Sequence, residues 1–204
     1  MLNIDWFQPF KHTPYSVGGI YLAILNLPRA VRYNRQNMIL VGVMPGPSEP
    51  SLEQINHYLN PLVQELQHLW KGIKFQTLKN HETETVRAAL IMSSMDLPAI
   101  CKTHGFVSYI SRCHKCSWSF HGSQSDGGTT ATAANYQPRE VNEHKRQGLL
   151  WRSCLTPAER DAFVQRYGTR FSVLMNLEYY DTISFVAIDP IHNLWLGTAR
   201  WPSK

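Results

Sequence analysis

Three aspartates, Asp5, Asp96 and Asp189, stand at the ends of apolar segments of the sequence. Phosphoryl transfer by two metal ions needs carboxylates that converge from different strands onto ions about 4 Å apart. Carboxylate oxygens are ligands that suit Mg²⁺ and Mn²⁺. An aspartate that precedes Pro or Leu-Pro, as Asp189 and Asp96 do, is also a common helix N-cap. A metal ligand and an N-cap therefore both stay open for these residues.

A Cys-x-x-Cys pair, Cys113-His-Lys-Cys116, has the spacing with which two thiolates close on one Zn²⁺ from a tight turn. Two further ligands must complete the tetrahedron, and the sequence offers as candidates His144, His121, His104, Cys101 and Cys154. Buried inert cysteines and a redox pair are the alternatives, although no thioredoxin-like βαβ pattern surrounds the pair.

A second acid and imidazole pair occurs near the end of the sequence. In Asp189-Pro-Ile-His192 the two side chains stand one helical turn apart, on one face if the segment is helical. This spacing fits a metal site or a pair beside one, and it fits equally a histidine that is satisfied at the start of a helix.

The elements that must position these residues follow from hydrophobic spacing. Two apolar runs of strand length, residues 20–27 and 37–44, predict an antiparallel pair. Their unbroken apolar character predicts a sheet covered on both faces. Ser51 and Gln54 have the spacing of a capping box ahead of a leucine stripe, which predicts a helix lying on that sheet.

The apolar run at residues 86–95 predicts a third buried element, strand or helix, that ends at Asp96. A short strand around Ile4 would come before the others. The resulting order of strands, helix and a further apolar element ending in an acid is similar to the opening half of the ribonuclease H-like fold.

The second half of the sequence contains a change of character. Small polar residues at 117–138 predict a flexible loop inside an insertion. Thr156 and Glu159 predict a helix with a capping box that stops near Gly168. Residues 183–188 predict a last short strand.

Composition limits the class of protein. The 204 residues are 43% hydrophobic and contain no apolar run of about 18 residues, so neither wholesale disorder nor a transmembrane span is expected. The N-terminus has no secretory signal pattern, so the cysteines are expected to be thiols or metal ligands in an intracellular protein. A net charge of +5 is compatible with nucleic acid as a partner.

Several segments together resemble one known family in collinear order over essentially the whole chain. They are Asp5-Trp-Phe-Gln-Pro-Phe10, Pro45-Gly-Pro-Ser-Glu-Pro50, Asn60-Pro-Leu-Val63, Asp96-Leu-Pro-Ala99, Arg170-Phe-Ser-Val-Leu174 and Asp189-Pro-Ile-His-Asn-Leu-Trp-Leu-Gly-Thr-Ala199. The resemblance is to the catalytic region of CACTA (En/Spm-type) transposases, in the variant found in fungal genomes.

The resemblance implies an α/β (α+β) fold with a partial ribonuclease H-like mixed sheet, flanking helices and a zinc-knuckle insertion. It implies a catalytic domain that cuts and rejoins DNA with Mg²⁺ or Mn²⁺. Asp5 matches the first catalytic acid of the family and Asp96 the second, so both are expected to bind the catalytic metal. Asp189 and His192 match the family's acid-x-x-His signature.

The knuckle and the domain boundaries follow from the same resemblance. Cys113 and Cys116 match the cysteine pair of the knuckle, which implies a structural Zn²⁺, and His144 matches a histidine expected as a further ligand. Residues 1–105 are expected to form the first part of the core, residues 106–150 the insertion, and residues 151–204 the continuation.

The sequence also departs from the family pattern. The third catalytic acid is expected beyond the Asp189 segment, where the sequence ends at Lys204; Glu178 and Asp181 are substitutes that the resemblance does not support. Only four residues precede Asp5, which predicts a stub in place of a normal strand. We therefore expect a fragment of a cut-and-paste transposase that is inactive by itself.

The expected partner is the DNA of transposon ends. No membrane partner is expected, whereas a homo-oligomer and a nuclear location are expected for the full-length family. The alternatives are a non-catalytic zinc-containing module that binds nucleic acid or serves assembly, and a decayed transposon relic.

Overall fold

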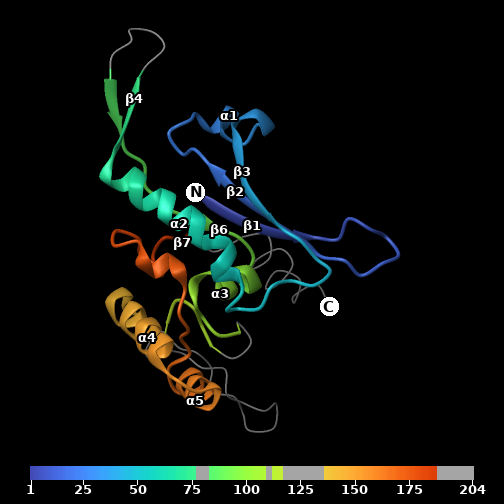
Figure 1. Ribbon diagram of the computed structural model, residues 1–204, viewed down its shortest axis with the longest axis vertical. Helices are drawn as coiled ribbons and strands as arrows, with labels where there is room; N and C mark the ends of the chain where they lie inside the picture. The colour runs from blue at the N-terminus through green and yellow to red at the C-terminus, as the bar shows by residue number, and fades with distance from the viewer. Residues whose placement is uncertain (77–82, 109–111, 117–135, 188–204) are drawn as a thin grey trace.

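The structure is a computed structural model that describes residues 1–76, 83–108, 112–116 and 136–187. Its centre is a five-stranded sheet in the order β3-β2-β1-β6-β7 (Figure 1). The strands are β1 (Leu2–Phe7), β2 (Val17–Ala23), β3 (Met38–Met44), β6 (Ser93–Ser94) and β7 (Val186–Ala187). The first three are antiparallel neighbours, and β6 and β7 run parallel to β1. The expected mixed α+β fold is confirmed, as is the antiparallel pairing of the two apolar runs.

β1 occupies the middle of this sheet, and the expectation of a stub at Asp5 is wrong. All six residues of the strand pair with β2, and Leu2 also pairs with Ser93 of β6. The N-terminal ammonium of Met1 donates a hydrogen bond to the Ala23 carbonyl at 2.9 Å. Pairing therefore begins at the first residue, so a normal strand forms although few residues precede Asp5.

The helix α2 (Ile55–Lys71) packs its apolar stripe into the main core. The reciprocal hydrogen bonds of the predicted capping box are present, since Gln54 N–H donates to Ser51 Oγ at 3.2 Å and Ser51 N–H donates to Gln54 Oε1 at 2.9 Å. They close a turn just before the helix, which begins at Ile55 with Gln54 at the N-cap. The buried residues of α2 share this core with Leu2 and Ile4 of β1 and Ile20 of β2. Burial of these side chains fixes the helix against the sheet.

β3 is an edge strand whose apolar side chains are largely exposed. Ile39, Leu40, Val41 and Val43 are 36–56% exposed, and from this strand Met44 alone joins the buried core. The prediction that both faces of this run are covered is therefore wrong for the described residues. An edge strand has a neighbour on one side only, so its unbroken apolar character does not guarantee burial.

A two-stranded hairpin extends from the end of α2 (Figure 1). It consists of β4 (Ile73–Gln76) and β5 (Thr83–Val86), and the four residues of β5 are exposed. The prediction that residues 86–95 form one buried element is wrong. The first residue of this run ends the exposed hairpin strand, and only β6, with two residues, forms regular structure within the rest.

The helices α3 (Leu97–His104), α4 (Val141–Ser153) and α5 (Pro157–Tyr167) complete the described chain, with the short turns α1 (Arg29–Arg32), η1 (Arg35–Asn37) and η3 (Val173–Asn176). The capping box of α5 is confirmed, since Thr156 Oγ1 accepts from Glu159 N–H and the Glu159 carboxylate accepts from Thr156 N–H. The helix ends at Gly168, which has a φ of 68°. Within the described ranges no helix combines the length and apolarity needed to cross a membrane.

The last predicted strand is shorter than expected. β7 holds two residues, because the Asp181 carboxylate accepts hydrogen bonds from the N–H groups of Ile183 and Ser184 and folds that part into a turn. The loop expected at 117–138 falls largely outside the described residues.

Candidate active site

Asp5 and Asp96 belong to neighbouring parallel strands. Leu2 of β1 pairs with Ser93 of β6, and each aspartate lies three residues further along the chain. The Asn3 side chain donates to the Ser94 carbonyl at 2.6 Å, which joins the two strands between these points. Since parallel strands advance by nearly equal steps, both aspartates lie toward the same end of the sheet.

Asp5 is exposed on the face of the sheet opposite the main core. Ile4 is buried and Trp6 packs against the core, and alternate side chains of a strand point to opposite faces. Asp5 pairs across the strands with Gly19, where an added Cβ would lie 2.5 Å from the Tyr21 ring. The glycine therefore leaves room for Tyr21 to lie over β2 beside Asp5.

Asp96 is half-buried and is the N-cap of α3. Its Oδ1 atom accepts a hydrogen bond from Ala99 N–H at 2.8 Å. The N-cap, one of the two alternatives for Asp96, is confirmed, and it does not remove the other. A carboxylate has two oxygens, so a cap on Oδ1 is compatible with a metal ligand at Oδ2.

A buried hydrogen-bond network lies behind Asp96. Ser93 Oγ is 2.6 Å from the Tyr180 hydroxyl, and His104 Nε2 is 3.0 Å from the same hydroxyl and 3.2 Å from Ser93 Oγ. His104 Nδ1 donates to the Ile100 carbonyl, and burial lowers the pKa of His104 to about 3. The neutral imidazole thus ties the end of α3 to β6. Sequence reasoning missed this network, because its members are far apart in the chain and no spacing connects them.

Cys113 and Cys116 stand on a tight turn next to the sheet. Lys115 N–H donates to Cys113 Sγ at 3.3 Å, and Arg139 Nε donates to the carbonyls of both cysteines at 3.0 and 3.1 Å. These hydrogen bonds hold the turn, whose two sulfurs have the sequence spacing of a Zn²⁺ ligand pair.

Lys115 connects this turn to β7. Its ammonium donates to the carbonyls of Ile183 and Val186 at 2.5 Å each. Burial lowers the pKa of Lys115, while the Asp181 carboxylate opposes that shift. Lys115 therefore joins the cysteine turn to the edge strand of the described sheet.

His144 lies on α4 and is 2% exposed. Its Nε2 donates to the His104 carbonyl at 3.0 Å, its Nδ1 lies 3.3 Å from Thr169 Oγ1, and its ring stacks on Phe106. Burial lowers the pKa of His144 to about 4. Among the described residues no three His, Cys, Asp or Glu side chains lie together as a metal site, so the structure does not bring His144 to the cysteine pair.

The other candidate ligands lie apart from such a group as well. His104 is used by the buried network, and burial raises the pKa of Cys101 to about 12. Cys154 ends α4, where its thiol donates to the Leu150 carbonyl. His121, Asp189 and His192 lie outside the described residues.

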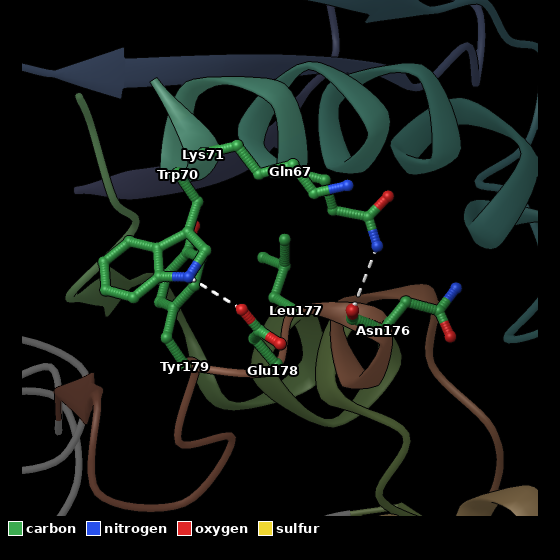
Figure 2. Close-up of a pocket in the computed structure, with 7 residues that line it drawn as sticks. All are labelled: Gln67, Trp70, Lys71, Asn176, Leu177, Glu178 and Tyr179. Atoms are coloured by element: carbon green, nitrogen blue, oxygen red, sulfur yellow. Dashed lines mark hydrogen bonds between the residues drawn. The ribbon is translucent and has the colours of Figure 1, made fainter. Parts of the chain in front are cut away.

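The two acids considered as substitutes both make local contacts. Figure 2 shows Glu178 in a cleft of about 210 Å³ at the end of α2, where its Oε1 accepts from Trp70 Nε1 at 2.8 Å. Gln67 donates to the Asn176 carbonyl in the same cleft. Asp181 caps the turn before β7. These contacts explain both carboxylates without a metal.

Residues 1–129 match the transposase family tnp2. The match covers more than half of the 204 residues and includes both aspartates and the cysteine pair. The chain therefore belongs to this transposase family, whose class of function is DNA transposition. No curated protein matches the chain.

Proposed function

We propose that the chain carries the metal-binding catalytic region of a cut-and-paste DNA transposase of the CACTA (En/Spm) type, in its fungal variant. Its sheet is of the ribonuclease H-like kind. The strand order β3-β2-β1-β6-β7, with an antiparallel first half and parallel β1, β6 and β7, supports that proposal. The observation that carries the proposal is the position of the two aspartates: Asp5 and Asp96 each lie three residues after the paired residues Leu2 and Ser93 of two parallel strands.

Asp5 and Asp96 are the ligands of the proposed Mg²⁺ or Mn²⁺. The exposed carboxylate of Asp5 and the second oxygen of Asp96 suit such a hard cation. Metal ions held there would supply charge stabilisation at a phosphodiester and would lower the pKa of bound water. Asp96 is held in place by its cap on Ala99 and by the buried network behind it. Asp189 and His192 remain the proposed signature pair of the family.

Cys113 and Cys116 are the proposed ligands of a structural Zn²⁺, with His144 as a further ligand. The hydrogen bond from His144 Nε2 to a backbone carbonyl is the support that zinc-bound histidines usually have. Binding of the same Zn²⁺ by His144 would require a rearrangement, because the structure does not place His144 with the cysteine pair. The Zn²⁺ would stabilise the turn that Lys115 connects to β7.

The proposed partner is the DNA of transposon ends, handled by a homo-oligomer in the nucleus. The second candidate function is a zinc-containing module that binds nucleic acid or serves assembly without cleaving DNA, or a relic of such an element. It is favoured by the finding that the described residues bring no third acid to Asp5 and Asp96.

The test is Mn²⁺ binding measured by calorimetry. Asp5→Asn and Asp96→Asn each remove one carboxylate, and Asn is as good an N-cap as Asp, so α3 stays capped in the second variant. We expect each variant to lose most Mn²⁺ affinity, while the matched control Asp161→Asn, an exposed acid on α5, keeps it. Equal affinity in all four proteins would favour the non-catalytic module.

A further inference from the structure

A cleft of about 360 Å³ opens between α2, the end of α4, the start of α5 and the segment before η3. Asn56 holds two of these parts together, since its side chain donates to the Phe171 carbonyl at 3.3 Å and accepts from Val173 N–H at 2.7 Å. A site of this volume is large enough for one phosphate group and its adjoining sugar.

Two arginines of the cleft are stacked on aromatic rings. Arg152 lies 4.7 Å from the centre of the Phe171 ring, and Arg160 lies 4.9 Å from the Trp151 ring. Stacking orients a guanidinium and leaves the N–H groups at its edge available to a ligand. The cleft therefore holds two positive charges in fixed orientations.

The cleft also contains buried donors without acceptors. Trp151 is 6% exposed, and its Nε1 finds no acceptor among the described residues; the same is true of Arg160 Nε. A buried donor left unsatisfied is costly, and native structures usually provide a partner. Both of these atoms are buried, so the donors that a ligand in the cleft can reach are the outer N–H groups of Arg152 and Arg160.

One acid competes for the cleft. Glu53 Oε2 lies 3.4 Å from Arg160 Nη1, a long contact between side chains that are 59% and 35% exposed. Exposed ion pairs of this kind add little stability, so an anionic ligand can replace Glu53 as the partner of Arg160.

We propose that this cleft binds a phosphate of the DNA backbone, with Arg152 and Arg160 as charged donors and the Phe171 and Trp151 rings as the surfaces that orient them. The assignment takes DNA as the ligand from the proposed function, and it concerns a second surface, separate from the Asp5 and Asp96 pair. Phosphate oxygens accept several hydrogen bonds and prefer arginine, which matches the donor excess of the cleft.

The test is the affinity for a labelled duplex of mixed sequence, measured by fluorescence anisotropy over a series of salt concentrations. The double variant Arg152→Gln/Arg160→Gln should bind about tenfold more weakly or worse. The slope of its log affinity against log salt concentration should also be shallower. The slope should decrease in magnitude by about 0.9 for each phosphate that the variant no longer neutralises. Trp151→Phe keeps a ring under Arg160 and should keep most of the duplex affinity.

The matched control is Arg146→Gln/Arg166→Gln, which removes the same charge from α4 and α5 outside the cleft. Arg166 also lies over a ring, that of Tyr167. Equal losses in the two double variants would overturn the proposal, because general charge would then explain binding. Arg152→Gln alone, at an exposed residue, tests the cleft if the double variant unfolds.

Inorganic phosphate separates the two sources of the ligand. If phosphate raises the melting temperature of the wild type but not of Arg152→Gln/Arg160→Gln, and duplex affinity is the same in all variants, the site binds free phosphate and the DNA assignment is overturned. Failure here is distinct from failure of the catalytic proposal. The cleft variants should keep Mn²⁺ affinity whether or not they lose duplex affinity.

Discussion

His104 Nε2 lies 3.0 Å from the Tyr180 hydroxyl, and both side chains are almost completely buried, at 0% and 1% exposure. The pair meets Ser93, so the network joins β6 to the last turn of α3. Asp96 lies in the chain between these two points. The backbone that carries Asp96 is therefore held on both sides by one buried polar cluster.

Burial of His104 makes stability depend on pH. Its pKa is lowered from 6.5 to about 3, so below pH 6.5 the unfolded chain binds a proton that the folded chain does not. The free energy of unfolding should therefore fall with decreasing pH through this range, by about 1.4 kcal/mol per pH unit for this residue. His114 and His144, with pKa values lowered to about 4, add to the same trend.

Urea unfolding at about pH 7 and about pH 5 checks this expectation on zinc-free protein. His104→Gln should be less stable at neutral pH but should lose less stability on acidification than the wild type. His57→Gln removes an exposed histidine and serves as the matched control. If His104→Gln and the wild type show the same slope, His104 is not the neutral buried group described above.

Zinc should stabilise the fold through the cysteine turn. Chelation should lower the melting temperature of the wild type, because metal binding energy contributes to folding. Without chelator, Cys113→Ser/Cys116→Ser should already have the lower melting temperature of the chelated wild type. Adding chelator should not lower it further. The Cys154 thiol donates a hydrogen bond to the Leu150 carbonyl at the end of α4. The control variant Cys154→Ser should show the same fall in melting temperature on chelation as the wild type. An unchanged melting temperature on chelation would contradict the zinc proposal.

The N-cap of α5 should contribute measurably to stability. Thr156→Ala removes the acceptor of Glu159 N–H and should lower the free energy of unfolding by about 1 kcal/mol. Thr156→Ser keeps a hydroxyl at the same place and should change it much less. Urea unfolding compares the three proteins, and equal midpoints would show that the cap adds no stability in this context.

Local signals explain which elements the sequence could predict. The helix after Ser51 and the helix between Thr156 and Gly168 were predictable, because caps and leucine spacing act within one helical turn. The pairing of the two apolar runs was predictable for a similar reason. The relative position of Asp5 and Asp96 in the site was not predictable. It depends on the pairing of Leu2 with Ser93, two residues that are far apart in the chain.

The remaining differences have long-range causes. β1 forms a full strand because β2 and β6 pair with it on both sides, which no property of residues 2–7 reveals. α4 lacks a strong apolar stripe, and it buries only His144, Gly148 and Trp151. Gly148 leaves space that the Met175 side chain fills, a contact between distant segments. Such packing decides the position of a polar helix, so pattern alone could not find it.

The central claim is that Asp5 and Asp96 together form one binding site for divalent metal ions. The most direct measurement is cleavage of the polypeptide by hydroxyl radicals made at bound Fe²⁺ in place of Mg²⁺, followed by mass spectrometry of the fragments. We expect cuts close to residues 5 and 96, competed away by Mg²⁺ and absent from Asp5→Asn and Asp96→Asn. Cuts that lie elsewhere, or that persist unchanged in both variants, would contradict the claim.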